Sequence, residues 1–231
     1  MWPKLPITSI TPFTFQDFPE RTACILWFSG CNMACGYCHN PELVKGTLAR
    51  LPEPKITDFL NSRKGLLEGV VLSGGECTLA NALPELCRYL KAMGFQVKID
   101  TNGTRPEMIA HLLNQALVDF IALDFKAPER KYTAITHHAD FSAFEHSLKL
   151  IASASIETEI RTTVHGDLLD TDDLNIMTAQ LEALRYTGPY VVQNFRTVPT
   201  LGGLTTPQRP FNPADLTPRA FPTRLRNFKG L

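Results

Sequence analysis

The hydrophobic residues of this chain follow two patterns that alternate along its length. Short apolar or alternating runs, typical of strands, occupy residues 23–28, 69–72, 95–99, 119–123, 157–164 and 189–195. Apolar residues at three- and four-residue spacing predict helices over residues 56–60, 83–93, 106–116, 141–151 and from 171 onward. Six strands that alternate with helices predict an α/β fold with a mainly parallel sheet.

The remaining stretches lack either pattern. Residues 1–22 form a Pro-rich lead-in, and prolines predict a loop over residues 41–54. His137 and His138 are interpreted as part of a polar loop, because neighbouring residues point apart and do not form a metal pair. Residues 214–228 form a basic amphipathic end, continued by Lys229, that we expect to pack as a helix or to contact a partner. We expect a single domain over residues 1–231, with a lead-in (1–22), a barrel core (23–196) and a C-terminal extension (197–231).

Three cysteines at C-x3-C-x2-C spacing follow the first predicted strand: Cys31, Cys35 and Cys38. Thiolates are soft ligands that select zinc, copper(I) or iron–sulfur clusters, and this spacing is too tight for ordinary disulfide pairing. Closed structural sites use four protein ligands, so three thiolates on a four-iron cluster leave one iron open for chemistry. The alternative is a Cys3His zinc site, in which His39 and the adjacent Cys38 both bend back onto one ion. The other cysteines, Cys24, Cys77 and Cys87, are interpreted as packing residues.

Polar residues follow three of the predicted strands, where α/β proteins place their ligands. The stretches are Ser73-Gly74-Gly75-Glu76, Asp100-Thr101-Asn102-Gly103 and Asp124-Phe125-Lys126. Period-two alternation places Asp124 and Lys126 on the same face. Taken singly, these stretches could be an ordinary turn, an Asn-Gly turn and a surface ion pair.

The cysteine loop, with Tyr37 before its last cysteine and His39-Asn40-Pro41 after it, resembles the radical S-adenosylmethionine (SAM) superfamily. The Cys-His-Asn-Pro ending resembles its glycyl-radical-activating branch. Within that branch, Arg161-Thr162-Thr163-Val164 is similar to the long anaerobic ribonucleotide reductase activating proteins. The chain departs from the family pattern at Cys77, where relatives carry Pro, and at Glu20, where they carry Gly.

The resemblance implies a partial, open TIM-like barrel of about six βα units that binds a 4Fe-4S cluster and SAM. The cluster ligands would be Cys31, Cys35 and Cys38, which makes them the catalytic and metal-binding residues. The SAM contacts would be Tyr37, His39, Gly74, Gly75, Glu76, Asp100, Thr101, Asn102, Asp124, Lys126 and Arg161. Glu76 would meet the SAM amino group, and Arg161 would clamp its carboxylate. The reduced cluster would cleave SAM, and the resulting radical would take a hydrogen atom from the substrate.

The resemblance also implies partners. The hydrogen donor would be a glycine of a glycyl-radical enzyme, with the anaerobic ribonucleotide reductase large subunit expected first. A low-potential donor such as flavodoxin or ferredoxin would supply the electron. The alternatives are another glycyl-radical partner, a small molecule such as a deazapurine precursor, or a zinc-binding interaction module without catalysis.

Charge and composition argue against several other classes of protein, such as nucleic-acid-binding and membrane-spanning proteins. Lys+Arg and Asp+Glu both number 23, and this balance argues against nucleic-acid binding, which requires a basic excess. The chain contains no apolar run near the ~18 residues of a membrane span. Residues 1–6 lack the apolar core of a signal peptide, and six cysteines without a signal favour reduced thiols in a cytoplasm.

Overall fold

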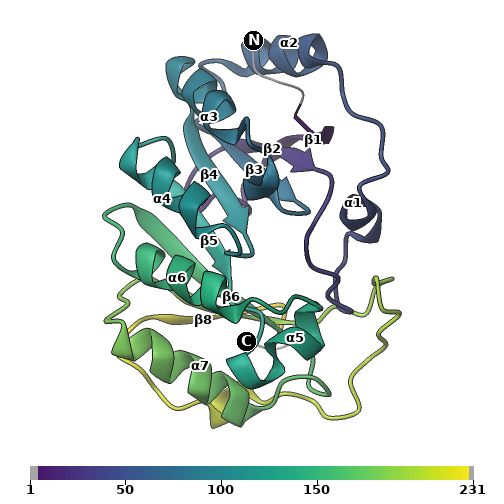
Figure 1. Cartoon of the computed structure of the whole chain (residues 1–231), viewed down its shortest axis with the longest axis vertical. Helices are drawn as coiled ribbons and strands as arrows, with labels where there is room; N and C mark the ends of the chain where they lie inside the picture. Colours follow the sequence, from purple (N-terminus) through teal and green to yellow (C-terminus); the bar gives the residue numbers. More distant parts are fainter. Residues whose placement is uncertain (1–4, 229–231) are drawn as a thin grey trace. The chain divides into compact units, whose positions relative to one another are not determined.

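The computed structural model describes residues 5–228 and shows a mainly parallel α/β sheet (Figure 1). Its strands follow chain order, so β1 and β8 end an open sheet: β1 Ile7–Thr14, β2 Ala23–Phe28, β3 Gly69–Gly74, β4 Gln96–Thr101, β5 Phe120–Asp124, β6 Glu157–Val164, β7 Tyr190–Asn194 and β8 Thr223–Arg226. The α-helices are α1 Pro41–Lys45, α2 Glu53–Arg63, α3 Leu83–Ala92, α4 Pro106–Asn114, α5 Glu129–Thr136, α6 Phe141–Ala152 and α7 Thr171–Ala183. The predicted α/β class is confirmed, and the open parallel sheet is that of a partial barrel.

The chain divides into two compact units. The first contains the described residues of 1–32, 42–101 and 107–121. In it, β1 pairs antiparallel with β2, while β2, β3 and β4 are parallel and in register, with Ile25 opposite Val71 and Val71 opposite Lys98. Helix α3 packs along β4 (Figure 1).

The second unit contains residues 33–41 and 102–106 and the described residues of 122–231. Its strands β6, β7 and β8 are parallel, with Thr162 opposite Val192 and Val192 opposite Leu225. Helix α7 begins with a capping box formed by Asp170 and Asp173. Asp173 is fully buried and accepts hydrogen bonds from Arg130 (2.6 Å) and Lys131 (2.5 Å), so the helix start is held by charge as well as by its cap.

All six predicted strands are present, but four elements correct the predictions made from the sequence. The lead-in contains β1, whose Pro12 is tolerated because the strand lies at the sheet edge and its pairing is irregular between Thr11 and Thr14. The predicted 41–54 loop contains α1, which is five residues long and too short to show periodicity. Helix α5 was not predicted either, and His137 closes it in a left-handed conformation (φ 56°).

The fourth correction concerns the basic end of the chain, which forms the strand β8 and not a helix. Its apolar residues Phe221, Leu225 and Phe228 have helical spacing, yet Pro222 interrupts the pattern and residues 223–226 pair with β7. Phe221 is buried against the rings of Tyr186 and Tyr190, at centroid distances of 6.0 and 6.3 Å. Lys229 lies outside the described residues.

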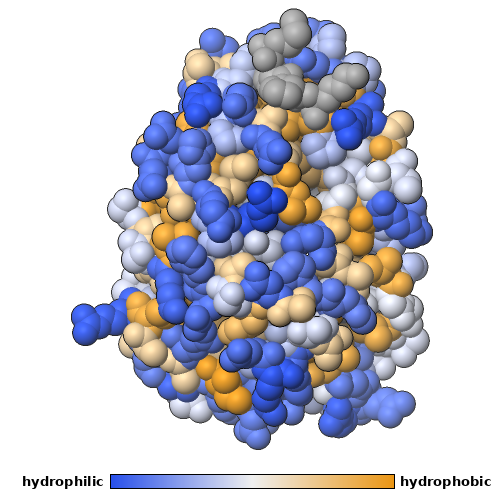
Figure 2. Space-filling model, viewed as in Figure 1, coloured by the Kyte–Doolittle hydropathy of each residue, from blue (hydrophilic) through white to orange (hydrophobic). Residues whose placement is uncertain are grey.

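The helices and the surface of the described residues can be compared with what a membrane span requires. None of the helices there is both long and apolar enough to span a bilayer. Hydrophilic and hydrophobic residues are interspersed on the face drawn in Figure 2. The large exposed hydrophobic residues include Phe13 and Phe15, whose rings contact each other edge to face at 4.5 Å.

Candidate active site

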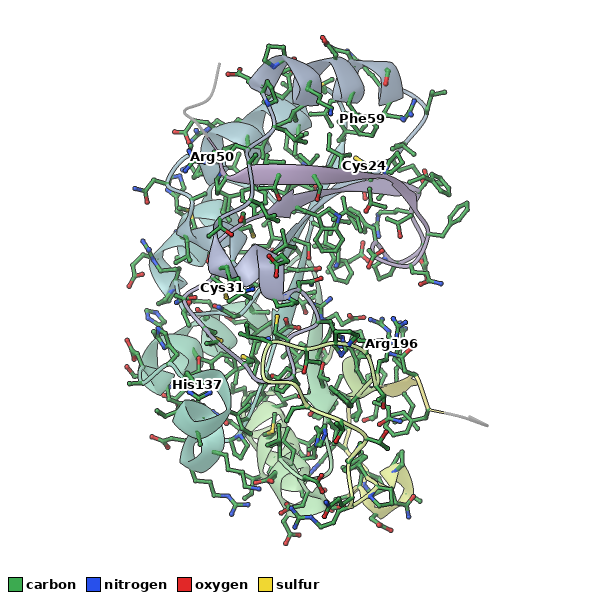
Figure 3. The ribbon with its side chains drawn as sticks, turned by 90° about the vertical axis from the view of Figure 1, so that its right-hand side faces the viewer. Cys24, Cys31, Arg50, Phe59, His137 and Arg196 are labelled. Atoms are coloured by element: carbon green, nitrogen blue, oxygen red, sulfur yellow. The ribbon has the colours of Figure 1, made fainter. Side chains whose placement is uncertain are left out.

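The six free cysteines fall into two groups with different surroundings. Cys24, Cys77 and Cys87 are fully buried, and burial raises the pKa of Cys24 and Cys87 to about 12. Cys31 and Cys38 are partly exposed, and Cys35 is 5% exposed. Figure 3 labels one cysteine of each group in the first unit, with Cys24 on a strand and Cys31 on a loop.

Residues 33–41 form the part of the cysteine loop that belongs to the second unit. The loop is held by backbone hydrogen bonds: the Ala34 N–H donates to the Thr136 carbonyl at the end of α5, and the Cys38 N–H donates to the Cys35 carbonyl, both at 2.9 Å. Burial raises the pKa of the Cys35 thiol, and the Lys126 ammonium opposes that rise. A metal would therefore have to displace the Cys35 proton on binding.

Cys31 belongs to the first unit, where its preceding residue is fixed against the end of β3. The Gly30 N–H donates to the Leu43 carbonyl (2.7 Å), and the Gly30 carbonyl accepts from the Glu76 N–H (2.9 Å). Gly75 must lack a side chain, because its Cβ would lie 2.0 Å from the Gly30 oxygen. Since Cys31 and Cys35 are only four residues apart, their Cα atoms are at most about 14 Å apart.

The kind and number of possible ligands support a metal site, although their side chains are not already arranged around a metal position. The described residues contain no group of three His, Cys, Asp or Glu side chains already arranged to hold a metal ion. Three cysteines in one loop, none of them in a disulfide and two of them partly exposed, nevertheless fit an iron–sulfur cluster in type and number. The other three cysteines, Cys24, Cys77 and Cys87, are fully buried and have no exposed thiol surface.

Glu76 follows β3 as a buried carboxylate that is held in place by hydroxyl and amide donors. It is 3% exposed, and its Oε1 accepts from the Thr78 N–H (3.1 Å), the Thr78 hydroxyl (2.5 Å) and the Thr101 hydroxyl (2.8 Å). Such bonds fix the orientation of a carboxylate and reduce the cost of burying its charge. Glu76 and Thr101 come from neighbouring strands, so the structure brings together these two predicted residues.

Asp100, at the end of β4, is held by a second set of partners. The Ser73 hydroxyl donates to Asp100 Oδ2 at 2.8 Å, and Lys98 forms an ion pair with Oδ1. Lys98 is 2% exposed, and its ammonium lies 5.5 Å from the Phe120 ring centroid. Sequence reasoning missed Lys98. The available signal was a lysine two positions before Asp100 on the same face of an apolar strand.

Asp124, Lys126 and Arg161 form a charged group in the second unit. Asp124 accepts hydrogen bonds from Arg161 Nε at 2.9 Å and from Lys126 Nζ at 3.3 Å. Burial alone would raise the pKa of the Asp124 carboxyl, but the Arg161 and Lys126 charges outweigh it and lower that pKa to about 2. The group therefore carries one negative and two positive charges near neutral pH.

The two predicted aromatic residues of the loop lie in the same unit. Tyr37 is 7% exposed, its ring centroid is 5.9 Å from Lys126 Nζ, and burial raises the pKa of its hydroxyl well above the usual value. The His39 ring lies 5.6 Å from the Phe195 ring, and partial burial lowers the pKa of His39. Tyr37 thus adjoins the charged group, while His39 adjoins the residue after β7.

Asn102 has a structural function in the second unit. Its Oδ1 accepts from the Thr104 N–H (3.1 Å) and the Thr104 hydroxyl (2.7 Å), which forms a local turn. Gly103 follows with φ 76°, and a Cβ there would lie 2.7 Å from a Leu123 methyl group. The predicted site residues are therefore gathered as Glu76 with Thr101, Asp100 with Ser73, and Cys35 and Tyr37 with the Asp124 group.

Comparison with known proteins identifies the class of protein that this fold and these residues define. The family model "Radical SAM superfamily" matches residues 25–177, which is more than half of the chain. The chain therefore belongs to the radical SAM superfamily, whose members use a 4Fe-4S cluster and SAM. Within it, the chain belongs to the glycyl-radical enzyme activating enzymes, as its relatives show.

One relative is a Methanocaldococcus jannaschii protein provisionally named glycyl-radical enzyme activating enzyme MJ1227, 34% identical over 74% of this chain and 73% of the relative. Another is the pyruvate formate-lyase-activating enzyme of Clostridium pasteurianum, 28% identical over 72% of this chain and 71% of the relative. Among solved structures, Streptococcus suis SuiB has the same fold, with a TM-score of 0.63 and 15% identity. The similarity covers 83% of this chain but only 42% of SuiB, which has also been solved bound to SAM.

Proposed function

We propose that this chain cleaves SAM reductively and generates a glycyl radical on a partner enzyme. The observation that carries the proposal is the loop of three cysteines outside any disulfide in a chain of the activating family, with Cys35 close to a charged group of the expected kind. When bound, the 4Fe-4S cluster supplies the electron that breaks a carbon–sulfur bond of SAM. We assign Cys31, Cys35 and Cys38 as its ligands.

The remaining site residues would bind and orient SAM. Glu76, with its oxygen fixed by three donors, suits the ammonium of the methionine part. Arg161 and Lys126 suit its carboxylate, because a guanidinium and an ammonium both donate to that group. Asp100 and Asp124 are acceptors suited to ribose hydroxyls, and Tyr37 and His39 suit the adenine side. Gly74 and Gly75 allow close approach to the backbone, while Asn102 shapes the turn that continues to Thr104.

For the partner, we propose the large subunit of an anaerobic ribonucleotide reductase. The resemblance of residues 161–164 to the long activating proteins supports this choice over another glycyl-radical enzyme. A low-potential flavodoxin or ferredoxin would deliver the electron. We propose that the chain works in the cytoplasm, where such reduced cofactors occur.

The partner can be tested by electron paramagnetic resonance. The reconstituted protein, SAM and reductant are mixed anaerobically with purified ribonucleotide reductase large subunit or with pyruvate formate-lyase. A glycyl radical on the reductase alone, absent when its radical glycine is replaced by alanine, is the expected result. A radical on pyruvate formate-lyase alone would reassign the partner. SAM cleavage without a radical on either enzyme would favour a small-molecule substrate.

A further inference from the structure

The segment that follows β7 runs back to the cysteine loop within the second unit. We call residues 197–209 the strap. The Leu201 N–H donates to the Cys38 carbonyl at 3.0 Å, and the Gly202 N–H donates to the Gly36 carbonyl at 2.8 Å. In Figure 3 the strap is part of the pale yellow segment that leads away from Arg196. Two backbone bonds thus join the strap to the stretch that carries the last predicted ligand.

This contact requires glycine at position 202, which faces Gly36. A Cβ on Gly202 would lie 2.7 Å from the Gly36 Cα and 3.0 Å from its carbonyl oxygen. Both atoms belong to the backbone, so neither could move aside without displacing the cysteine loop. A Leu204 methyl group lies 4.0 Å from the ideal Cβ position of Gly36, so a strap side chain also packs beside this glycine.

The strap is anchored beyond its contact with the cysteine loop. His165 is 3% exposed, and its Nε2 lies 2.9 Å from the Thr205 carbonyl, an acceptor, so Nε2 carries the proton. The Asp167 carboxylate accepts from the N–H groups of Gln208 (2.9 Å) and Arg209 (3.0 Å). The strap is thus fixed by β7 at one end and by the residues after β6 at the other.

We infer that the strap is a positioning element for the cluster-binding loop and that Gly202 is the residue that allows it to dock. The inference rests on the proposed function, since it takes Cys38 as a cluster ligand. A backbone held at Gly36 and Cys38 limits the motion of the Cys38 thiolate. Hydrogen bonding and solvent exposure near the ligands are the means by which a protein tunes an iron–sulfur cluster.

The test compares Gly202→Ala with a matched control in the same loop, Gly203→Asn. Gly203 has φ 64° and open space at its Cβ position, and asparagine tolerates that conformation. Amide hydrogen exchange is measured first on the iron-free protein. We expect the amides of residues 201 and 202 to exchange slowly in wild type and in Gly203→Asn, but about tenfold faster in Gly202→Ala, as loss of about 1.4 kcal/mol implies.

The second readout is the rate at which a chelator removes iron from the reconstituted protein. We expect about tenfold faster removal from Gly202→Ala, and a smaller increase from Asp167→Ala, which leaves both glycines intact and removes the strap's anchor at Gln208 and Arg209. Unchanged exchange and iron removal in Gly202→Ala, or equal effects in Gly203→Asn, would overturn the inference. If wild type takes up no iron, the proposed function fails, whereas the exchange experiment still decides whether the strap is docked.

Discussion

At the scale of single residues, Asp124 combines burial with two cationic partners. Arg161 Nε and Lys126 Nζ donate to opposite oxygens of its carboxylate, which is 29% exposed. A charge in this position is stabilised only while both partners remain. The residue types were predicted as SAM contacts, but the pairing of Arg161 with Asp124 was not, because Arg161 lies 37 positions further along the chain.

Asp124→Asn should lower the free energy of unfolding of the iron-free protein by about 2 kcal/mol at pH 7, because the amide loses both ion pairs. The folded pKa of about 2 lies below the ordinary 3.8, so this stability is present above about pH 4 and is lost as the pH falls toward 2. Urea unfolding of both proteins should give a constant difference down to about pH 5, then a shrinking one. A difference that stays constant down to pH ~2.5 would contradict this explanation.

Thr101→Val should weaken SAM binding about tenfold in the reconstituted protein, because Glu76 Oε1 loses the Thr101 hydroxyl as a donor and its orientation loosens. Isothermal titration of wild type and variant measures the effect. Thr57→Val is the matched control, since Thr57 bonds only its own helix α2 at an exposed position. Equal affinities for wild type and Thr101→Val would remove Glu76 from the proposed SAM contacts.

Replacing Cys31, Cys35 or Cys38 with Ala should abolish iron uptake, whereas Cys77→Ala should retain it. Cys77 is fully buried and donates only a weak 3.5 Å hydrogen bond to the Asp100 carbonyl, so its position suits packing. Iron and sulfide per chain after anaerobic reconstitution measure the outcome, with Cys87→Ala as a second buried control. Loss of iron in Cys77→Ala would show that the packing interpretation is wrong.

At the scale of elements, the six predicted strands could be found because they carry buried apolar runs, as in β2, β3 and β5, or alternate, as in β6. The two edge strands could not. β1 contains Pro12, and the four residues of β8 alternate too briefly to be distinguished from a helical pattern. Helix α5 was missed for another reason: its sequence is mostly polar, and its burial depends on contacts with α6 that periodicity does not reveal.

Gly75→Ala should break the junction between β3 and the turn that carries Glu76. The added Cβ would lie 2.0 Å from the Gly30 carbonyl oxygen, so the backbone before Cys31 would have to shift. We expect a loss of about 2–3 kcal/mol in the free energy of unfolding, together with weaker iron retention. Gly65→Asn is the control, because Gly65 has φ 75° and open space around it. A Gly75→Ala protein as stable as wild type would contradict the close approach.

At the scale of the whole molecule, sequence motifs point to the candidate site residues but not to the contacts that hold them. The cysteines, Glu76, Asp100 and Asp124 follow strand ends and could be found from spacing. The bonds from Thr101 to Glu76 and from Ser73 to Asp100 could not, nor could the strap, because these contacts depend on which strand or loop lies alongside in space. Hydrophobic patterning specifies elements, whereas the neighbours of a polar side chain are specified by the assembled fold.

The proposed function requires that the three thiolates of Cys31, Cys35 and Cys38 support reductive cleavage of SAM. The measurement is 5′-deoxyadenosine production after anaerobic reconstitution with iron and sulfide, followed by dithionite and SAM, in wild type and in Cys35→Ala. We predict a brown wild-type protein with about four irons that releases 5′-deoxyadenosine, and a variant that releases none. A colourless wild-type protein that holds zinc and leaves SAM intact would contradict the account and favour a zinc-binding interaction module.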